Sequence, residues 1–234
     1  LANAPDDARF RYVESNFRFL RGALRLRGVT ETDGILADLG VSSHHFDTAE
    51  RGFSFRFDGP LDMRMNRTGG TRTAADVVNT YEAEQLAALL GRYGELDKCF
   101  RVANAIVRYR EAKGSVETIG GLLAATENVT PKGGESKFRA KLFQALRIEV
   151  NGEMQALEMM LAQAIRLLAP LGRLSVITYH SLEGSSEPVK ETYKSLEEAQ
   201  TKLNSYIEGN SITGAVEAKV IYAEDAKVLT QCVT

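Results

Sequence analysis

The chain has 234 residues, 44% hydrophobic and 26% charged, so it is long enough to bury a large core, and this balance excludes disordered, collagen-like and coiled-coil classes. Its 29 Lys and Arg residues nearly match 31 Asp and Glu residues, a net charge of −2, which excludes a uniformly basic nucleic-acid coat but allows a local basic patch. Cys99, Cys232, His44 and His45 lack partners at metal-ligand spacing, and no run of about 18 apolar residues occurs, so we expect a cytoplasmic protein without a metal site or a membrane segment.

Two apolar runs predict buried strands of a parallel sheet. The first covers residues 34–39 and is flanked by glycines, and the second covers residues 174–179. A helix is expected over residues 153–168, because its apolar residues recur every three or four positions. This order of elements is typical of an α/β fold, in which ligands bind beyond the carboxyl ends of the strands, here around Asp38 and His180.

The region between the two strands has a different character. Residues 48–72 are rich in Gly, Arg and Asp with little periodicity, and they predict a long structured loop. Apolar residues at helical spacing then predict four helices, over residues 83–90, 100–113, 116–126 and 138–148.

Asp38 and His180 are the candidate catalytic residues, because each lies at the end of a predicted strand. A carboxylate in this position can accept hydrogen bonds from a ligand amine or hydroxyl, but it can equally cap a helix or a turn. A histidine there can act as an acid or a base, yet a lone histidine is more often a hydrogen-bonded structural group. The residue types alone leave both alternatives open.

Basic residues gather in two places. In the loop, Arg64 follows Asp58 and Asp62, so this segment is either functional or pinned by an internal Asp–Arg pair. Residues 132–147 carry five basic side chains against one acidic one, a local net charge of +4. Such a helix face is either simply solvated or a contact to an RNA backbone.

Several longer motifs occur in a characteristic order. They are DGILADLGVSS at 33–43, AERGFSF at 49–55, DGPLDMRM at 58–65, YGE at 93–95, FQALRI at 143–148 and YHSLE at 179–183. The set lies within residues 8–183 and strongly resembles the bacterial 16S rRNA (cytosine-N4)-methyltransferase family, the RsmH or MraW type, in particular its Bacteroidetes branch.

The resemblance implies an α/β fold, the class I or Rossmann-like methyltransferase fold, that is partial and carries an inserted helical domain. Residues 1–47 and 142–184 would form the methyltransferase domain. Residues 48–141 would form the insert that helps recognise RNA. Residues 185–234 would be a tail of unknown relation to the family.

The implied reaction is transfer of a methyl group from S-adenosyl-L-methionine to the N4 amine of a cytidine in 16S rRNA, within the small ribosomal subunit. By resemblance, Phe17, Asp38 and His45 contact the cofactor. For the reaction itself, we expect Asp38 or a backbone carbonyl near Gly40 to accept from the amine, and His180 to orient the base or to take up the proton. The expected RNA contacts are basic residues of the loop and the later helix, namely Arg51, Arg64, Lys137, Arg139 and Arg147.

The family's glycine-rich cofactor motif, and the acidic residue that binds the ribose, precede the position of Leu1. We therefore expect this polypeptide to bind S-adenosylmethionine weakly, and a non-catalytic fragment that retains RNA or partner binding is the alternative to an active enzyme. An apolar strand edge around Ile35 and Leu39 would then favour association, for example as a homodimer.

Overall fold

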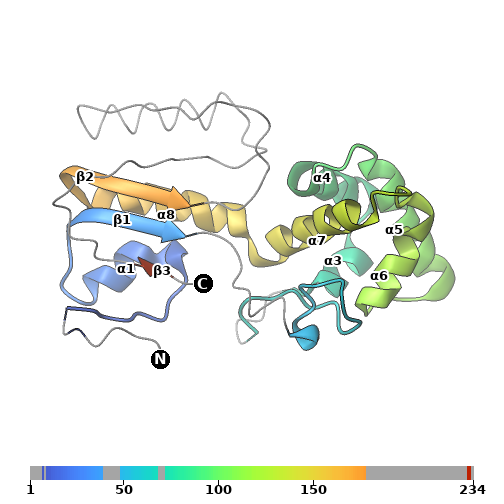
Figure 1. Cartoon of the computed structure of the whole chain (residues 1–234), viewed down its shortest axis with the longest axis horizontal. Helices are drawn as coiled ribbons and strands as arrows, with labels where there is room; N and C mark the ends of the chain where they lie inside the picture. Colours follow the sequence, from blue (N-terminus) through green and yellow to red (C-terminus); the bar gives the residue numbers. More distant parts are fainter. Residues whose placement is uncertain (1–6, 8, 39–47, 68–71, 178–230, 233–234) are drawn as a thin grey trace. The chain divides into compact units, whose positions relative to one another are not determined.

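The structure is a computed structural model that describes residues 7, 9–38, 48–67, 72–177 and 231–232 (Figure 1). The chain divides into two compact units. Unit 1 comprises Leu1–Gly40 and Met154–Thr234, and unit 2 comprises Val41–Glu153. The expected limits of an inserted domain, residues 48–141, stay a prediction, because compactness alone does not assign a role to either unit.

The described part of unit 1 contains a parallel sheet of three strands in the order β2-β1-β3. The strands are β1 (Thr32–Asp38), β2 (Leu168–Ile177) and β3 (Gln231–Cys232). In the register of β1 and β2, Ile35 lies opposite Leu174 and Asp38 lies opposite Ile177. The expectation that the two apolar runs form neighbouring parallel strands is therefore confirmed, and β1 ends at Asp38.

Helix α8 (Glu153–Leu167) runs alongside β1 and β2 (Figure 1). It has the expected extent within one residue, because its apolar positions recur at helical spacing and face one core. This core joins α8, the sheet and the short helix α1 (Leu20–Arg25). Its buried members are Leu20, Ile35, Ala37, Met160, Leu161, Ala164, Leu167 and Val176.

The junction between α8 and β2 is irregular. Thr32 lies opposite Leu168, but Gly34 lies opposite Arg173, so β2 bulges between these two pairings. Gly172 allows the close approach, since a Cβ there would lie 2.9 Å from the carbonyl oxygen of Ala169. Because the residues before the bulge also pair with β1, β2 begins directly after α8, six residues earlier than the apolar run at 174–179 predicts.

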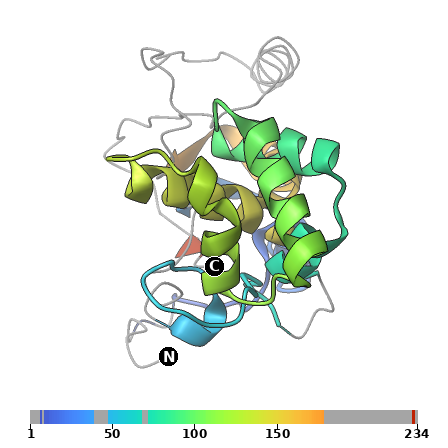
Figure 2. The same ribbon diagram turned by 90° about the vertical axis from the view of Figure 1, so that its right-hand side faces the viewer.

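Unit 2 is mainly helical. Its helices, teal to yellow in Figures 1 and 2, pack around one apolar core that includes Leu61, Leu90, Ile106 and Leu146. The helices are α3 (Ala74–Thr80), α4 (Ala83–Gly94), α5 (Cys99–Lys113), α6 (Ile119–Thr126) and α7 (Glu135–Asn151), with short 3-10 turns η2 (Ala49–Arg51) and η3 (Glu127–Val129). None of the helices in the described ranges is long and apolar enough to cross a membrane.

The four helices expected in this region are present, and α3 is an additional one. Helix α3 begins with a capping box, in which the hydroxyl of Thr73 accepts from the backbone N–H of Asp76 at 3.0 Å. The carboxylate of Asp76 in turn accepts from the N–H of Thr73 at 2.8 Å. This Thr-x-x-Asp pattern is the sequence signal that could have revealed the helix.

Helices α4 and α7 approach closely at Gly94, which explains part of the YGE motif. A Cβ at Gly94 would lie 2.8 Å from the carbonyl oxygen of Lys141 and 3.2 Å from the Cβ of Ala145. The side-chain amide of Gln144 donates to the carbonyl oxygen of Tyr93 at 3.0 Å. Gly94 therefore allows the close approach, and the contacts of Gln144 with Tyr93 and of Lys141 with Glu95 help to hold the two helices together.

Candidate functional site

A small hollow in unit 1 lies against β1. Its empty space is about 260 Å³, counting the part that is open to solvent. Asp38 is the one ionisable residue among the described residues that line it, and the others are apolar or aromatic. The lining residues are Phe17, Leu20, Ile35, Leu36, Ala37, Asp38 and Met160. Such a lining suits a ligand that has an apolar or aromatic group and a single polar anchor.

The side chain of Gln163 holds the aromatic wall of this hollow in place. From α8, its amide nitrogen donates to the carbonyl oxygen of Arg18 at 2.6 Å, and its amide oxygen accepts from the N–H of Arg21 at 3.0 Å. Gln163 of α8 therefore holds the chain at two points, at Arg18 in the 3-10 turn η1 (Phe17–Phe19) and at Arg21 in α1. The sequence does not predict this role for Gln163, because nothing in the local pattern separates it from a solvated glutamine.

Asp38 supplies the polar anchor. Its Oδ1 atom is buried and has no hydrogen-bond partner among the residues that the structure describes. A buried acceptor without a donor costs about 1–3 kcal/mol, so this oxygen is suited to accept from a ligand amine or hydroxyl. The structure thus brings Phe17 and Asp38, two of the three expected cofactor contacts, to one hollow.

The expected residues His45 and His180 lie outside the described residues. In the sequence, the last described residue before His180 is Ile177, which pairs with Asp38 at the end of β2. Within the described residues, no group of three or more His, Cys, Asp or Glu side chains could hold a metal ion.

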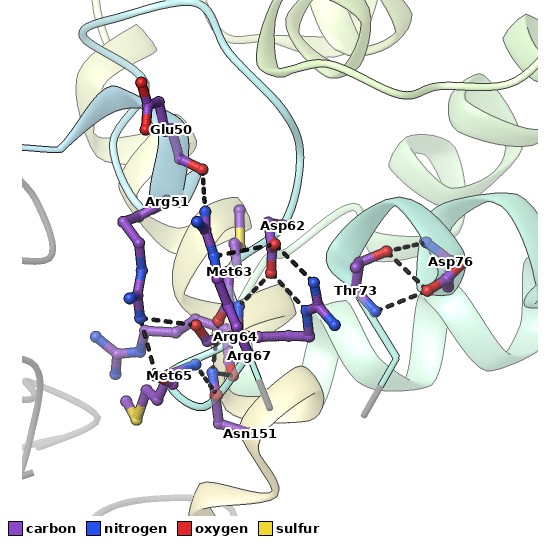
Figure 3. A network of polar contacts seen from close by, with 11 residues as sticks. Glu50, Arg51, Asp62, Met63, Arg64, Met65, Arg67, Thr73, Asp76 and Asn151 are labelled. Carbon is purple, nitrogen blue, oxygen red and sulfur yellow. Dashed lines mark hydrogen bonds and ion pairs between the residues drawn. The ribbon is translucent and has the colours of Figure 1, made fainter. Parts of the chain in front are cut away.

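Unit 2 contains a polar network around Asp62 in the segment that carries the DGPLDMRM motif (Figure 3). The carboxylate of Asp62 accepts from the Nε of Arg64 at 2.8 Å and lies 3.5 Å from the Nε of Arg67. Burial alone would raise the pKa of Asp62, but the hydrogen bonds and charges of these two arginines hold it below the ordinary value. Asp62 therefore stays ionised and fixes both arginines, as the internal-pair alternative predicted.

Backbone contacts hold the same segment in one conformation. The Nη2 of Arg51 donates to the carbonyl oxygens of Arg64 and Met65, both at 2.9 Å (Figure 3). The side chain of Asn151 accepts from the N–H of Met65 at 2.7 Å and donates to the carbonyl oxygen of Met63 at 2.8 Å. Burial and the charges of neighbouring arginines lower the pKa of Arg51.

The turn at Met63 explains why this support is needed. Met63 is fully buried and has a φ of 60°, a left-handed conformation that costs about 1–2 kcal/mol for a residue with a Cβ. Gly52 packs against the same turn, where a Cβ would lie 2.5 Å from the carbonyl oxygen of Pro60. Close packing and the contacts of Arg51 and Asn151 offset the strain.

The structure does not gather the expected RNA-binding residues into one surface. Arg51 and Arg64 lie in the Asp62 network, which contacts α7 at Asn151. Lys137 is exposed and Arg139 is half-buried near the start of the same helix. Twelve residues separate Arg139 from Asn151, a distance of about 18 Å along a helix axis.

The expectation for Arg147 needs a correction. Its side chain is only 6% exposed, and its guanidinium donates to both carboxylate oxygens of Glu153, at 2.8 and 3.1 Å. The second half of α7 is buried around most of its circumference, so a basic residue there points into protein and not into solvent. Arg147 therefore does not belong to an RNA-facing surface in this structure.

The small hollow lies beside the end of a parallel strand, the position at which α/β proteins commonly bind ligands. The chain belongs to the MraW methylase family, whose profile it matches over residues 2–225. Membership implies a class I methyltransferase fold, and the parallel pairing of β1 with β2 agrees with it. The match extends beyond residue 183, where the recognised motifs end.

Several curated relatives are similar to the chain, and each is named ribosomal RNA small subunit methyltransferase H. The protein of Parabacteroides distasonis is 57% identical over 182 residues, which are 77% of this chain and 59% of the relative. That of Bacteroides thetaiotaomicron is 56% identical over 181 residues, with the same two shares. That of Cytophaga hutchinsonii is 46% identical over 188 residues, which are 78% of this chain and 62% of the relative. The chain thus spans about three fifths of the length of the relatives it matches.

The buried pair of Arg147 and Glu153 predicts a strong asymmetry between single and double substitutions. Burial raises the pKa of Glu153, and Arg147 opposes this shift. Arg147→Met leaves the carboxylate buried without its partner, which should lower the free energy of unfolding by about 3–5 kcal/mol. Adding Glu153→Leu should recover most of the lost free energy of unfolding, because no buried charge remains.

Urea unfolding followed by circular dichroism measures both variants, since the chain contains no tryptophan. The loss in free energy of unfolding that Arg147→Met causes should become smaller as the pH falls, because protonation of Glu153 in the folded state removes the unpaired charge. Equal stabilities for the single and the double variant would contradict this view of the pair.

Proposed function

We propose that this chain carries cofactor-binding and RNA-binding parts of an S-adenosylmethionine-dependent methyltransferase that acts on the N4 amine of a cytidine in 16S rRNA. Membership of the methylase family and the names of the relatives support methylation of ribosomal RNA. The single observation that carries the proposal is the orphaned Oδ1 of Asp38, in the hollow that Phe17 also lines.

Phe17 and Asp38 fit different parts of the cofactor. The ring of Phe17 offers a flat apolar surface for the adenine, and the carboxylate of Asp38 accepts a hydrogen bond from an amine or a hydroxyl group. When bound, S-adenosylmethionine supplies a methyl group on a positively charged sulfur. His45 joins this set on the resemblance of its motif alone.

Asp38 also suits the target amine. The amine of cytosine is a poor nucleophile, because its lone pair is delocalised into the ring. A carboxylate that accepts its N–H localises that pair, and an ionised carboxylate has about four acceptor sites, enough for more than one donor. His180 is our candidate for taking up the proton, and the base must first leave its stack to reach the site.

Unit 2 supplies the proposed RNA contacts. Lys137 and Arg139 lie in the first part of α7, where the carboxylate of Glu135 is close enough for its pKa to be lowered by the charge of Arg139. Arg51 and Arg64 hold the Asp62 network together, so any contact they make to RNA uses a segment that is already rigid. Arg147 makes no such contact in this proposal, because it is buried against Glu153.

Asp38→Asn tests the cofactor site. The substitution keeps the shape of the side chain but removes its charge, so we expect the affinity for S-adenosylmethionine to fall about 10-fold to 100-fold, the worth of one charged hydrogen bond. Asp33→Asn is the matched control, since Asp33 lies on the same strand but is exposed. Titration calorimetry at high ligand concentration measures all three proteins. If both variants bind as the unaltered chain does, Asp38 is not a cofactor contact.

Charge reversal tests the RNA surface of unit 2. Lys137→Glu with Arg139→Glu should weaken binding to fragments of 16S rRNA by a similar factor for every sequence, because phosphate contacts do not depend on the base. Arg108→Glu with Lys113→Glu makes the same change of charge at exposed positions of α5. Filter binding over a range of salt compares the two pairs, and equal losses would show that α7 has no special role.

A further inference from the structure

A short segment of unit 1 is far more basic than the chain as a whole. Residues 15–30 contain four basic side chains and no acidic one, although the net charge of the chain is −2. The four are Arg18, Arg21, Arg25 and Arg27, and we refer to them as the arginine segment. Arg21, Arg25 and Arg27 are exposed, and Arg18 is half-buried.

The Nε of Arg18 donates to the Oδ1 of Asn16 at 3.3 Å, whereas the fold does not use the charges of Arg21 and Arg25 for its own stability. Within the described residues, the side chains of Arg21 and Arg25 form no hydrogen bond or ion pair, and that of Arg27 donates only to the carbonyl oxygen of Ala23, at 2.9 Å. Arg21 and Arg25 are four residues apart on α1, so two like charges share one helix face. Such a pair destabilises a helix by about 0.2–0.5 kcal/mol, which indicates a purpose other than folding.

The arginine segment begins at the wall of the cofactor hollow. Phe17 and Leu20 line the hollow, and Arg18 and Arg21 are the residues that directly follow them. Gln163 binds the backbone of these two arginines, so the segment is held in place next to the hollow.

We propose that the arginine segment binds the phosphate backbone of the RNA next to the methyl-transfer site. This inference rests on the proposed function and adds a contact surface on unit 1 to the one proposed for unit 2. The cofactor carries a single carboxylate and no phosphate, so it cannot account for four arginines. Guanidinium groups match phosphate oxygens in charge and geometry.

The apolar side chains of the segment agree with an RNA partner. Phe19 is 56% exposed and follows Arg18 directly, and surfaces for single-stranded RNA combine arginines with aromatic side chains on which bases stack. An anionic lipid surface also attracts arginines. However, α1 has only six residues, much shorter than the amphipathic helices that lie in membrane interfaces.

The test is a pair of charge reversals with a matched control. Arg21→Glu with Arg25→Glu should lower the affinity for a fragment of 16S rRNA about tenfold or more at about 0.1 M salt, and it should reduce the salt slope of log K by about 1.5–2. Arg166→Glu with Arg173→Glu makes the same change of charge at exposed positions of unit 1 and should have a clearly smaller effect. The neutral pair Arg21→Gln with Arg25→Gln should have an RNA affinity between that of the unaltered chain and that of the Arg21 and Arg25 reversal pair.

The outcomes separate this inference from the proposed function. Circular dichroism spectra and unfolding midpoints should be unchanged in all variants, since every altered side chain is exposed. If the unaltered chain binds RNA and the two reversal pairs weaken it equally, the arginine segment is not a contact, while the proposed function stands. If the unaltered chain binds no RNA, both fail. Binding to vesicles that contain phosphatidylserine, lost only in the Arg21 and Arg25 variants and without an effect on RNA, would also overturn the inference.

Discussion

The candidate cofactor site depends on the parallel pairing of β1 with β2. This pairing places Asp38 opposite Ile177, at the end of both strands, and so fixes where the carboxylate lies. Helix α8 leads directly into β2 and also carries Gln163, which binds the turn that bears Phe17. One helix–strand unit thus positions both the polar and the aromatic side of the hollow. A change in the register of β2 would move Asp38 and Phe17 apart.

Several residues of unit 2 stabilise the fold through contacts within the protein. Asn151 and Arg51 bind the strained turn at Met63, Gly94 allows α4 to approach α7, and Arg147 neutralises Glu153 inside the protein. Each of these residues thus lies where the backbone or a buried charge has few alternatives. Asp38 has a buried oxygen without a partner among the described residues, a property that it shares there with the Nε of Arg51.

The fold was largely accessible from the sequence, whereas the side-chain environment was not. The strands at 34–39 and 174–179 and the helix at 153–168 could be predicted, because apolar periodicity records which face of an element is buried. The prediction that Arg147 lies on a solvated face was wrong for a related reason. A row of basic residues indicates a solvated face only if the helix is exposed along its whole length, and α7 is buried in its second half. Gln163 could not be found, since its partners lie more than 140 positions away in the chain.

The cofactor site is tested most directly by mapping the residues at which the methyl donor binds on the folded chain. Nuclear magnetic resonance of the isotope-labelled protein, titrated with S-adenosylmethionine, detects even weak binding and assigns it to residues. We expect the backbone signals of Phe17, Ala37 and Asp38 to shift together with that of Met160, and those of the Asp62 network to stay in place. Shifts confined to unit 2, or no shift in the lining residues of the hollow at saturating ligand, would show that this hollow is not the cofactor site.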